Sequence, residues 1–284
     1  MLIGGHPGGA GVEIVELGNS PISICPDPPN TPIHLDGLAA TFINEQPMAC
    51  GGYGNVKCFT YSFASKAWTN NANLDLARGM VMGVMVDEST WWIVGGEPMT
   101  YTTEIFSGGT MSTGPILPRP ASMACLLKLN ATHFFLAGGK GTSNGDTVNS
   151  AHIMDWTTKT WTNLPGMQEL RRSPHCHYLD GEVFVAGGRG SSNAATTTEI
   201  FSQSTQTWRY GQKMPNTLEE ICCGSLTVGN EAGSLYMFGG YVRNVRVDDV
   251  YKFDQEKKEW TLLSKKLKIG RNAHAVIKLP DDFC

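Results

Sequence analysis

The stretch Leu136-Ala137-Gly138-Gly139, a short apolar segment that ends in two glycines, recurs along the chain. The other copies are Leu2-Ile3-Gly4-Gly5, Ala49-Cys50-Gly51-Gly52, Ile93-Val94-Gly95-Gly96, Val185-Ala186-Gly187-Gly188 and Met237-Phe238-Gly239-Gly240. The second glycines are 47, 44, 43, 49 and 52 residues apart, a period typical of propeller blades. Two glycines at the end of a strand indicate backbone with φ > 0, or a close approach that leaves no room for a Cβ.

Three further features recur at fixed places relative to the glycines. A tryptophan follows them in four repeats, as Trp68, Trp161, Trp208 and Trp260. An acidic, an aliphatic and a bulky residue lie between glycines and tryptophan, as Glu13-Ile14-Val15, Glu104-Ile105-Phe106, Glu199-Ile200-Phe201 and Asp249-Val250-Tyr251. An arginine often opens the segment before the glycines, as Arg78, Arg119, Arg172 and Arg271. This order predicts four strands per repeat, here called a to d, with the glycines closing b and the tryptophan on d.

The combination of motifs resembles the kelch repeat over the whole chain. The resemblance implies an all-β fold, a six-bladed β-propeller of four-stranded blades in one closed domain. We expect blade 1 from residues 271–284 together with 1–27, and the other five from residues 34–75, 78–114, 119–166, 171–215 and 218–268. The d strands of blades 1 and 3 are the weakest predictions, because Ile22-Ser23-Ile24-Cys25 lacks a tryptophan and blade 3 offers only Met111.

The two ends of the chain complement each other. Residues 2–5 are a b strand with no a strand before it, and residues 271–279 form an a strand with no b strand after it. Joining them in one sheet closes the ring and removes the last open strand edges. We therefore expect the C-terminal strand a to pair with the N-terminal strand b.

Composition and charge agree with a compact all-β domain. Charged residues make up 17% of the 284 residues, hydrophobic residues 41%, and 33 residues are glycine. A net charge of −4 gives no electrostatic reason to expect nucleic acid as a partner. No segment has the length and apolarity of a membrane span, and no secretory segment follows Met1. We expect no cofactor and no metal, because strand alternation separates Cys176 from His175 and His177 and no second cluster completes a site.

The eight cysteines predict disulfide bonds and an oxidising compartment. Cys50 and Cys58 fall on the b and c strands of one hairpin, and Cys125 and Cys176 fall on the a strands of successive blades. The pairing of the other four is left open, and the alternative is that the cysteines are small buried hydrophobes. The sequon Asn130-Ala131-Thr132 in an a–b turn is a candidate glycosylation site. The cysteine placement also resembles secreted kelch proteins of invertebrates, so we expect a secreted protein whose signal peptide is absent from this sequence.

The site is expected where the b–c and d–a loops meet around one end of the central channel, here called the mouth. The resemblance implies this location, since kelch adaptor domains bind acidic peptides there with arginines and tyrosines at matching places. Residues that differ from blade to blade suit a specific ligand, as Tyr53, Lys140, Arg189 and Tyr241 do. Together with Arg172 and Arg243 on the same face, they are the residues that we expect to bind ligand. Arg78 and Arg271 recur in the repeat, which favours a packing role for them.

The sequence thus predicts a secreted recognition module for a protein segment or an acidic or glycan ligand. One alternative is a sugar-modifying enzyme, because kelch-like mutarotases are six-bladed and use channel arginine and glutamate. Its candidate pair is Glu97 or Glu219 with Arg172. A second alternative is an intracellular adaptor or actin-binding scaffold, a role that several kelch proteins have.

Overall fold

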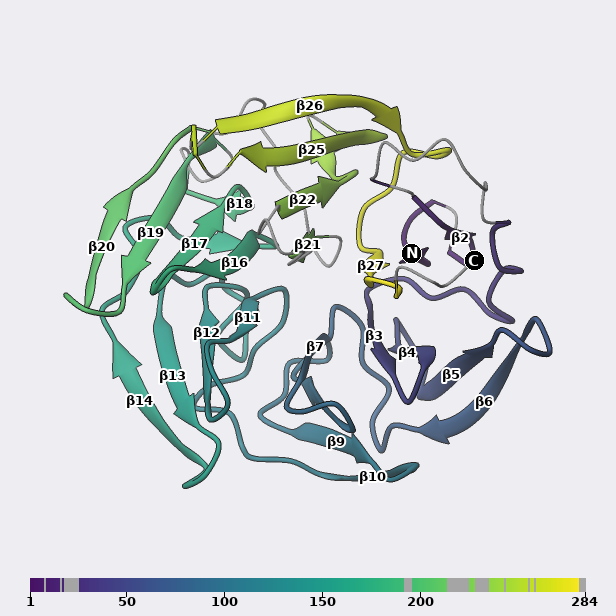
Figure 1. The fold of residues 1–284 in the computed structure, drawn as a ribbon. Coiled ribbons are helices and arrows are strands. Elements are labelled where there is room, and N and C mark those ends of the chain that lie inside the picture. Colours follow the sequence, from purple (N-terminus) through teal and green to yellow (C-terminus); the bar gives the residue numbers. More distant parts are fainter. Residues whose placement is uncertain are drawn as a thin grey trace.

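The computed structural model describes residues 1–7, 9–15, 17, 26–191, 196–213, 225–227, 235–242, 244–254, 256–257 and 259–280. Their regular elements are β-strands arranged as six blades around a central axis (Figure 1). Strand a of each blade lies innermost and strand d lies at the periphery in blades 2 to 6 (Figure 1). Among the described residues no helix is long and apolar enough to cross a membrane.

Blades 2, 3 and 4 are antiparallel meanders of four strands each. Blade 2 comprises β3 (Leu38–Ile43), β4 (Gln46–Gly51), β5 (Lys57–Ser62) and β6 (Ala67–Asn73). Blade 3 comprises β7 (Met82–Met85), β8 (Thr90–Val94), β9 (Thr103–Ser107) and β10 (Thr110–Thr113). Blade 4 comprises β11 (Cys125–Lys128), β12 (His133–Ala137), β13 (Ala151–Asp155) and β14 (Thr160–Leu164). Met111 therefore does lie on a d strand in blade 3.

Blades 5 and 6 each add a two-stranded ribbon at the mouth. Blade 5 comprises β16 (His175–Leu179), β17 (Glu182–Ala186), β19 (Thr198–Ser202) and β20 (Thr207–Tyr210), with the ribbon β15 (Arg171–Arg172) and β18 (Arg189–Gly190). Blade 6 comprises β21 (Ser225–Thr227), β22 (Leu235–Phe238), β25 (Asp249–Asp254) and β26 (Glu259–Lys266), with the ribbon β23 (Tyr241–Val242) and β24 (Val245–Arg246).

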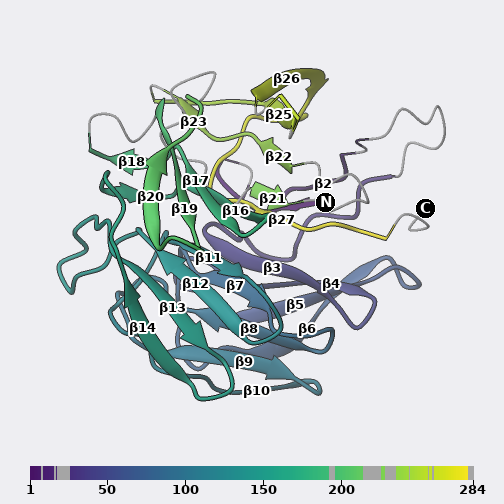
Figure 2. The same cartoon turned by 60° about the vertical axis from the view of Figure 1, so that its left-hand side comes forward.

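Blade 1 closes the ring with strands from both ends of the chain. Strand β1 (Leu2–Ile3) pairs with β2 (Val12–Glu13) on one side and with β27 (Ala275–Val276) on the other. In Figure 2 strand β27 lies close to the N-terminal end of the chain, in agreement with its pairing with β1. The expected closure of C-terminal strand a on N-terminal strand b is therefore confirmed. The expected d strand of this blade, residues 22–25, lies outside the described residues.

The glycine pairs have both of the expected causes. Gly95 and Gly96 have φ of 63° and 108°, in the region that side chains disfavour. A Cβ on Gly95 would also lie 2.0 Å from the main-chain oxygen of Ala121 in the next blade. The Gly96 N–H donates to that same oxygen at 2.8 Å, so the second glycine of the pair ties one blade to the next.

The hydrophobic core is divided into layers between neighbouring blades. Trp92 of blade 3 packs with Phe134 and Trp161 of blade 4, and Phe135 of blade 4 packs with Phe201 of blade 5. Three of the repeated tryptophans also donate an Nε1–H to the link that precedes their own blade. The pairs are Trp68 with the Pro29 oxygen (2.8 Å), Trp161 with Ile116 (3.0 Å) and Trp208 with Pro165 (2.7 Å).

The strand register corrects one predicted equivalence. Glu13, Glu104 and Glu199 each lie opposite the residue three places before the second glycine of their blade. In blade 6 that place is taken by Tyr251, opposite Met237, whereas the sequence grouped Asp249 with the glutamates. A register shift between Asp249 and Tyr251 in the β25–β26 ladder accompanies the difference.

Candidate functional site

In blades 1 to 5 the mouth is built by one residue pair from each blade. Each pair joins the residue after the second glycine to a residue just before strand a. These pairs extend the hydrogen-bonded ladder of strands a and b toward the mouth. Four pairs are antiparallel partners, namely His6 with Asn272, Glu97 with Gly79, Lys140 with Ser122, and Arg189 with Arg172. A fifth joins Tyr53 to Asp36 through an N–H to oxygen bond of 3.1 Å. The backbone thus fixes where each of these side chains begins.

Glu97 is the centre of a network that crosses blades 2 to 4. Its carboxylate accepts hydrogen bonds from the Tyr53 hydroxyl at 3.2 Å and from the Ser122 hydroxyl at 3.4 Å. The Lys140 ammonium forms an ion pair with it at 2.6 Å. Two predicted ligand-binding residues, Tyr53 and Lys140, are therefore brought together by a carboxylate that neutralises the lysine.

Tyr53 is held in place by three local devices. The Asn55 side chain donates to the Gly51 oxygen at 2.8 Å and accepts from the Lys57 N–H at 3.0 Å, which shapes the b–c loop. The Tyr53 ring lies against Gly79 of the next blade, where a Cβ would be 2.6 Å from the ring. The ring remains half exposed, at 50%. A planar aromatic surface is thus offered to solvent in a fixed position.

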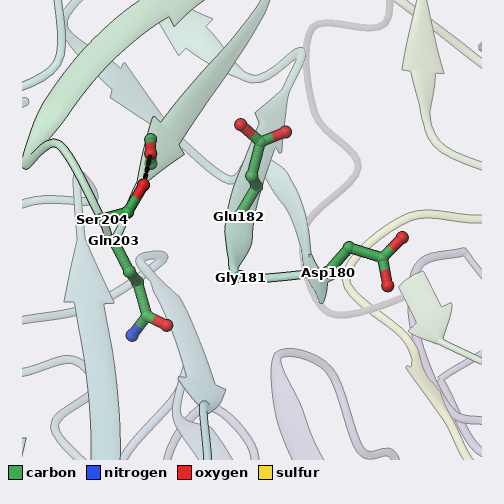
Figure 3. A pocket seen from close by; sticks show the side chains of 6 residues that line it. Asp180, Gly181, Glu182, Gln203 and Ser204 are labelled. Carbon is green, nitrogen blue, oxygen red and sulfur yellow. Dashed lines mark hydrogen bonds between the residues drawn. The ribbon is translucent and has the colours of Figure 1, made fainter.

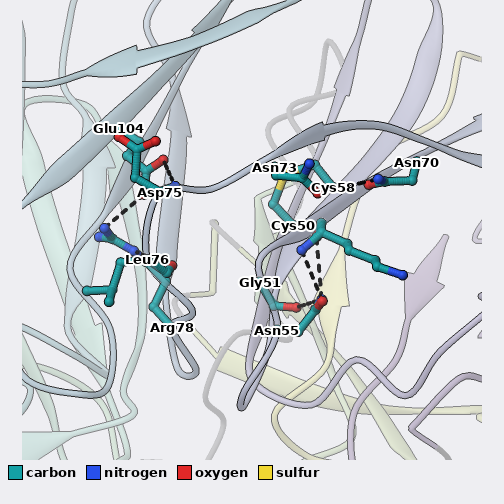
Figure 4. Close-up of a disulfide and its surroundings, with 11 residues drawn as sticks. Cys50, Gly51, Asn55, Cys58, Asn70, Asn73, Asp75, Leu76, Arg78 and Glu104 are labelled. Carbon is teal, nitrogen blue, oxygen red and sulfur yellow. Dashed lines mark hydrogen bonds and ion pairs between the residues drawn. A yellow bond between two sulfur atoms is a disulfide. The ribbon is translucent and has the colours of Figure 1, made fainter.

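The third device is the Cys50–Cys58 disulfide, which joins the two strands that carry the Tyr53 loop (Figure 4). It lies near the buried Arg78–Glu104 ion pair of blade 3 (Figure 4). A second disulfide joins Cys125 to Cys176, with Cα atoms 5.8 Å apart, and connects the a strands of blades 4 and 5. The other four cysteines, Cys25, Cys222, Cys223 and Cys284, lie outside the described residues.

Blade 5 places two arginines across from each other at the mouth. Arg172 and Arg189 are direct partners in the β15–β18 ladder, an arrangement that is unfavourable for like charges. The Arg172 guanidinium donates to the Thr147 hydroxyl of blade 4 at 3.0 Å, and Arg189 is exposed. Within the described ranges no carboxylate forms an ion pair with Arg172. This is the most cationic part of the mouth that the structure describes.

Blades 6, 1 and 2 complete the described part of the ring. The Arg246 guanidinium lies 5.7 Å from the centre of the Tyr241 ring and donates to the Asn272 side chain at 3.0 Å. Burial raises the pKa of Asp36, and the positive charges of His6 and Arg246 partly oppose that rise. Arg243, which was expected to bind ligand, lies outside the described residues.

The repeated arginines have a structural role, and the member of this series in blade 5 differs from the one predicted. Arg78, Arg171 and Arg271 are buried and form ion pairs with Glu104, Glu199 and Glu13 at 2.8, 2.8 and 3.2 Å. The equivalent residue of blade 5 is thus Arg171, whereas the sequence placed Arg172 in this series. Arg119 instead donates to the Gly138 oxygen at 2.5 Å, and burial lowers its pKa to about 10. Arg172 is left at the surface of the mouth.

The described residues bring together no catalytic pair of the expected kind. Glu97 is bound by blades 2 and 4, whereas Arg172 lies on blade 5 beside Thr147. Glu219 lies outside the described residues. At the end of blade 5 opposite the mouth, an open hollow is lined by Asp180, Glu182 and Gln203, and its two carboxylates point in different directions (Figure 3). Glu182 is bound there by Arg209 at 2.7 and 2.9 Å.

The remaining sequence candidates can also be placed. Asn130 is exposed in the a–b turn of blade 4, where its side chain accepts from the Thr132 and His133 N–H groups at 2.9 Å. His175 and His177 share one face of β16, with ring centres 5.4 Å apart, and Cys176 is bonded on the other side to Cys125. Among the residues with described positions, no group of three or more His, Cys, Asp or Glu could hold a metal ion.

Sequence reasoning missed several residues of the mouth, on both the strand a side and the b–c side. Asp36, Ser122 and Asn272 precede a strands, and Thr147 and Arg246 lie in b–c loops. Writing out the a–b hairpin register would have found the first three, because each lies opposite the residue that follows a glycine pair. No pattern in the sequence marks Thr147 or Arg246, since their contacts cross from blade to blade.

Fold and mouth together define a closed six-bladed propeller with a polar, partly cationic binding face. The family model described as "KLHDC2/KLHL20/DRC7 Kelch-repeats domain" matches residues 109–283, more than half of the chain, and the chain belongs to this kelch-repeat family.

Curated relatives are similar over shorter regions. The F-box/kelch-repeat protein At4g39580 of Arabidopsis thaliana is 28% identical over 166 residues, which are 58% of this chain and 42% of the relative. The F-box/kelch-repeat protein At4g33900 of the same plant is 36% identical over 85 residues, 30% of this chain and 22% of the relative. Kelch-like protein 40 of Mus musculus is 24% identical over 135 residues, 44% and 21% of the two chains. The chain thus matches less than half the length of these relatives.

Proposed function

We propose that this propeller is a protein-binding module that takes an extended acidic segment of a partner across its mouth. The observation that carries the proposal is the pairing of Arg172 with Arg189 in the β15–β18 ladder. Two arginines at directly opposed ladder positions carry like charges, which is unfavourable, and a carboxylate bound over this pair would offset that cost while accepting charge-assisted hydrogen bonds. The family relationship supports a binding role, and the partner's chemistry is inferred from the site alone.

The opposite side of the mouth suits the apolar part of such a segment. Tyr53, Tyr101 and Ile116 are 50%, 51% and 71% exposed on the loops of blades 2 and 3. Glu97, which lies beside Tyr53, is already bound by Tyr53 and Lys140. A segment lying across the mouth would place acidic side chains over blade 5 and apolar side chains over blades 2 and 3.

The test is a charge reversal at the mouth with a matched reversal elsewhere. Peptides are selected from a displayed library of random 12-residue sequences on the wild-type protein, and their affinities are measured by fluorescence anisotropy. The double variant R172E/R189E is expected to lose at least tenfold in affinity for the selected acidic peptides. The control K66E/K257E changes the net charge equally at exposed c–d turns, at the other end of the blades, and is expected to bind normally.

Two results would reject the acidic-segment proposal. One is a selection that yields no enrichment of Asp and Glu. The other is equal binding by R172E/R189E and the wild type. Heparin oligosaccharide binding that R172E/R189E abolishes, while the selected peptides bind that variant as well as the wild type, would instead assign the arginines to an acidic glycan.

We further propose an extracellular setting for this module. The proposal is supported by the two cysteine pairs placed within bonding geometry and by the exposed position of Asn130. Expression through a eukaryotic secretory pathway tests it, with a mass shift on glycosidase treatment that N130Q removes. Secretion without any glycan on Asn130, or failure to be secreted, would count against this setting.

A further inference from the structure

A cavity of 230 Å³ lies between blades 5 and 6, separate from the polar pairs of the mouth. Blade 5 lines it with His177, Phe184 and Ile200, and blade 6 lines it with Phe253 and Trp260. The His177 and Phe184 rings are stacked, with centres 4.5 Å apart and planes 9° apart. The walls therefore offer flat aromatic faces.

The interfaces of blade 3 with blade 4 and of blade 4 with blade 5 each contain a tryptophan hydrogen bond that this interface lacks among the described residues. Trp161 and Trp208 each pack against the preceding blade and donate Nε1–H to its exit link, through the oxygens of Ile116 and Pro165. Trp260 is the next tryptophan of the series, yet its Nε1 donates to no oxygen of the described residues. Its ring packs against Phe253 at 5.0 Å and edge-on to His175 at 5.7 Å, and it borders the cavity without filling it.

The link that corresponds to the acceptors of Trp161 and Trp208 can be identified from the register. Gly114 and Gly211 each donate an N–H at 2.8 Å to the first residue of strand c, Thr103 and Thr198. The residues that follow Gly211, Gln212 and Lys213, therefore correspond to the exit link that contains Ile116, and Gln212 lines the cavity. Elsewhere in this interface Ala186 of blade 5 packs with Met237 and Tyr251 of blade 6, and Trp260 packs against this cluster.

We propose that this cavity is a binding site for a small molecule that carries a planar, fused two-ring aromatic group with an N–H donor, such as an indole. The ring would take the place that a tryptophan fills in the neighbouring interfaces. Its N–H would donate to the exit link at Gln212, the residue of that link that lines the cavity. An apolar cavity of about 150 Å³ suffices for benzene, so 230 Å³ accommodates two fused rings. Substituents would leave past Tyr210 and the Arg209–Glu182 ion pair at the rim.

The first experiment asks, without any ligand, whether the cavity can accommodate an added indole side chain. Ile200 lines the cavity, and Ile105 is the equivalent residue in blade 3, where Trp161 already occupies the interface. I105W overpacks a filled interface and is expected to lower the Tm by at least about 3 °C. I200W places an indole in the cavity and is expected to leave the Tm unchanged or to raise it. An equal fall in both variants would mean that the cavity is closed in solution and would overturn the proposal.

The second experiment measures binding of indole to the whole chain by isothermal titration calorimetry. Saturable one-to-one binding is expected, with about fivefold weaker binding of 1-methylindole, which lacks the N–H donor. I200W should abolish binding, and I105W should retain it in the folded protein. Absence of saturable binding, or binding that survives in I200W, would overturn the proposal. N-acetyltryptophanamide binding as tightly as indole would move the assignment from a small molecule to a tryptophan side chain.

Discussion

Arg171 and Glu199 form an ion pair of 2.8 Å in which both side chains are completely buried. The guanidinium also donates to the oxygens of Gly187 and Thr197, at 2.8 and 3.1 Å. The other carboxylate oxygen accepts the Gln168 N–H of the link from blade 4. Each partner therefore fixes a different segment, and together they tie strand c of blade 5 to the glycine pair and to the preceding blade.

Removal of one partner should be strongly destabilising. E199A leaves the Arg171 charge buried among neutral acceptors, and we expect the free energy of unfolding to fall by about 3 kcal/mol or more. E182A removes the partner of Arg209 from an exposed ion pair, and there we expect a fall of less than about 1 kcal/mol. Urea denaturation of both variants provides the comparison. Equal losses in the free energy of unfolding would show that burial of the Arg171–Glu199 pair does not increase the cost of removing one partner.

The ion pair of this kind recurs in alternate blades. Blades 1, 3 and 5 carry it as Arg271 with Glu13, Arg78 with Glu104 and Arg171 with Glu199. In blades 2, 4 and 6 the place of the glutamate is taken by Phe59, His152 and Tyr251. Strand c is therefore joined to its surroundings by a buried ion pair in blades 1, 3 and 5 and by other side chains in blades 2, 4 and 6.

The sequence was sufficient for the fold because the decisive signals are local. Each glycine pair marks the end of a strand that has no room for a Cβ, as Gly95 against the Ala121 oxygen demonstrates. The closure between β1 and β27 followed from an a strand and a b strand left over at the two ends. The period and the glycines therefore indicated propeller blades, the resemblance to the kelch repeat implied the six-bladed fold, and the unpaired terminal strands predicted its closure.

The site was less predictable because its contacts cross from blade to blade. Arg171 and Arg172 are adjacent in the sequence, and only the ladder shows that Arg171 is buried and Arg172 faces the mouth. A register shift in β25–β26 likewise hid that Tyr251, not Asp249, occupies the glutamate position. The binding of Tyr53 and Lys140 to one carboxylate, that of Glu97, depends on side-chain lengths that repeat spacing does not encode.

Acid should destabilise the propeller through two buried histidines. Burial lowers the pKa of His175 and of His274 to about 3, while the unfolded chain titrates near 6.5. Below pH 6.5 the unfolded state therefore binds more protons, and stability is lost as the pH falls toward the folded pKa. Between pH 7.5 and 5 we expect a loss of about 2 kcal/mol from each histidine. Denaturant titrations across this range should show a shallower decline for H175F. An unchanged decline would exclude His175 as a source.

The cysteines of blades 2, 4 and 5 should resist alkylation in the unreduced protein. Denaturation without a reductant exposes every thiol, so only disulfide-bonded cysteines escape labelling. We expect the peptides with Cys50, Cys58, Cys125 and Cys176 to remain unmodified, and to be recovered as two cross-linked pairs by mass spectrometry. Labelling of all four would show that they are free thiols in the core and would remove the support for an oxidising compartment.

Glu97 should limit the positive charge at the mouth by neutralising Lys140. E97Q keeps the hydrogen-bonding side chain but removes the charge that neutralises Lys140, and so it leaves a third cation beside Arg172 and Arg189. Acidic peptides selected on the wild type are expected to bind E97Q at least threefold more tightly at low salt, with a steeper loss as salt is added. Weaker binding by E97Q would mean that Glu97 itself contacts the partner or that the network orders Tyr53 for binding.

The repeated tryptophans should differ in what their N–H groups contribute. The Trp208 Nε1–H donates to the Pro165 oxygen at 2.7 Å, and phenylalanine in its place leaves that carbonyl without this donor. W208F also loses indole packing against Phe135 and Phe201, so the comparison needs a second tryptophan that loses ring packing but no hydrogen bond. W260F supplies it, because Trp260 packs on Phe253 and His175 but donates to none of the described residues. We expect W208F to cost about 1 kcal/mol more than W260F in urea denaturation. Equal costs would mean that the interblade hydrogen bond adds nothing to stability beyond ring packing.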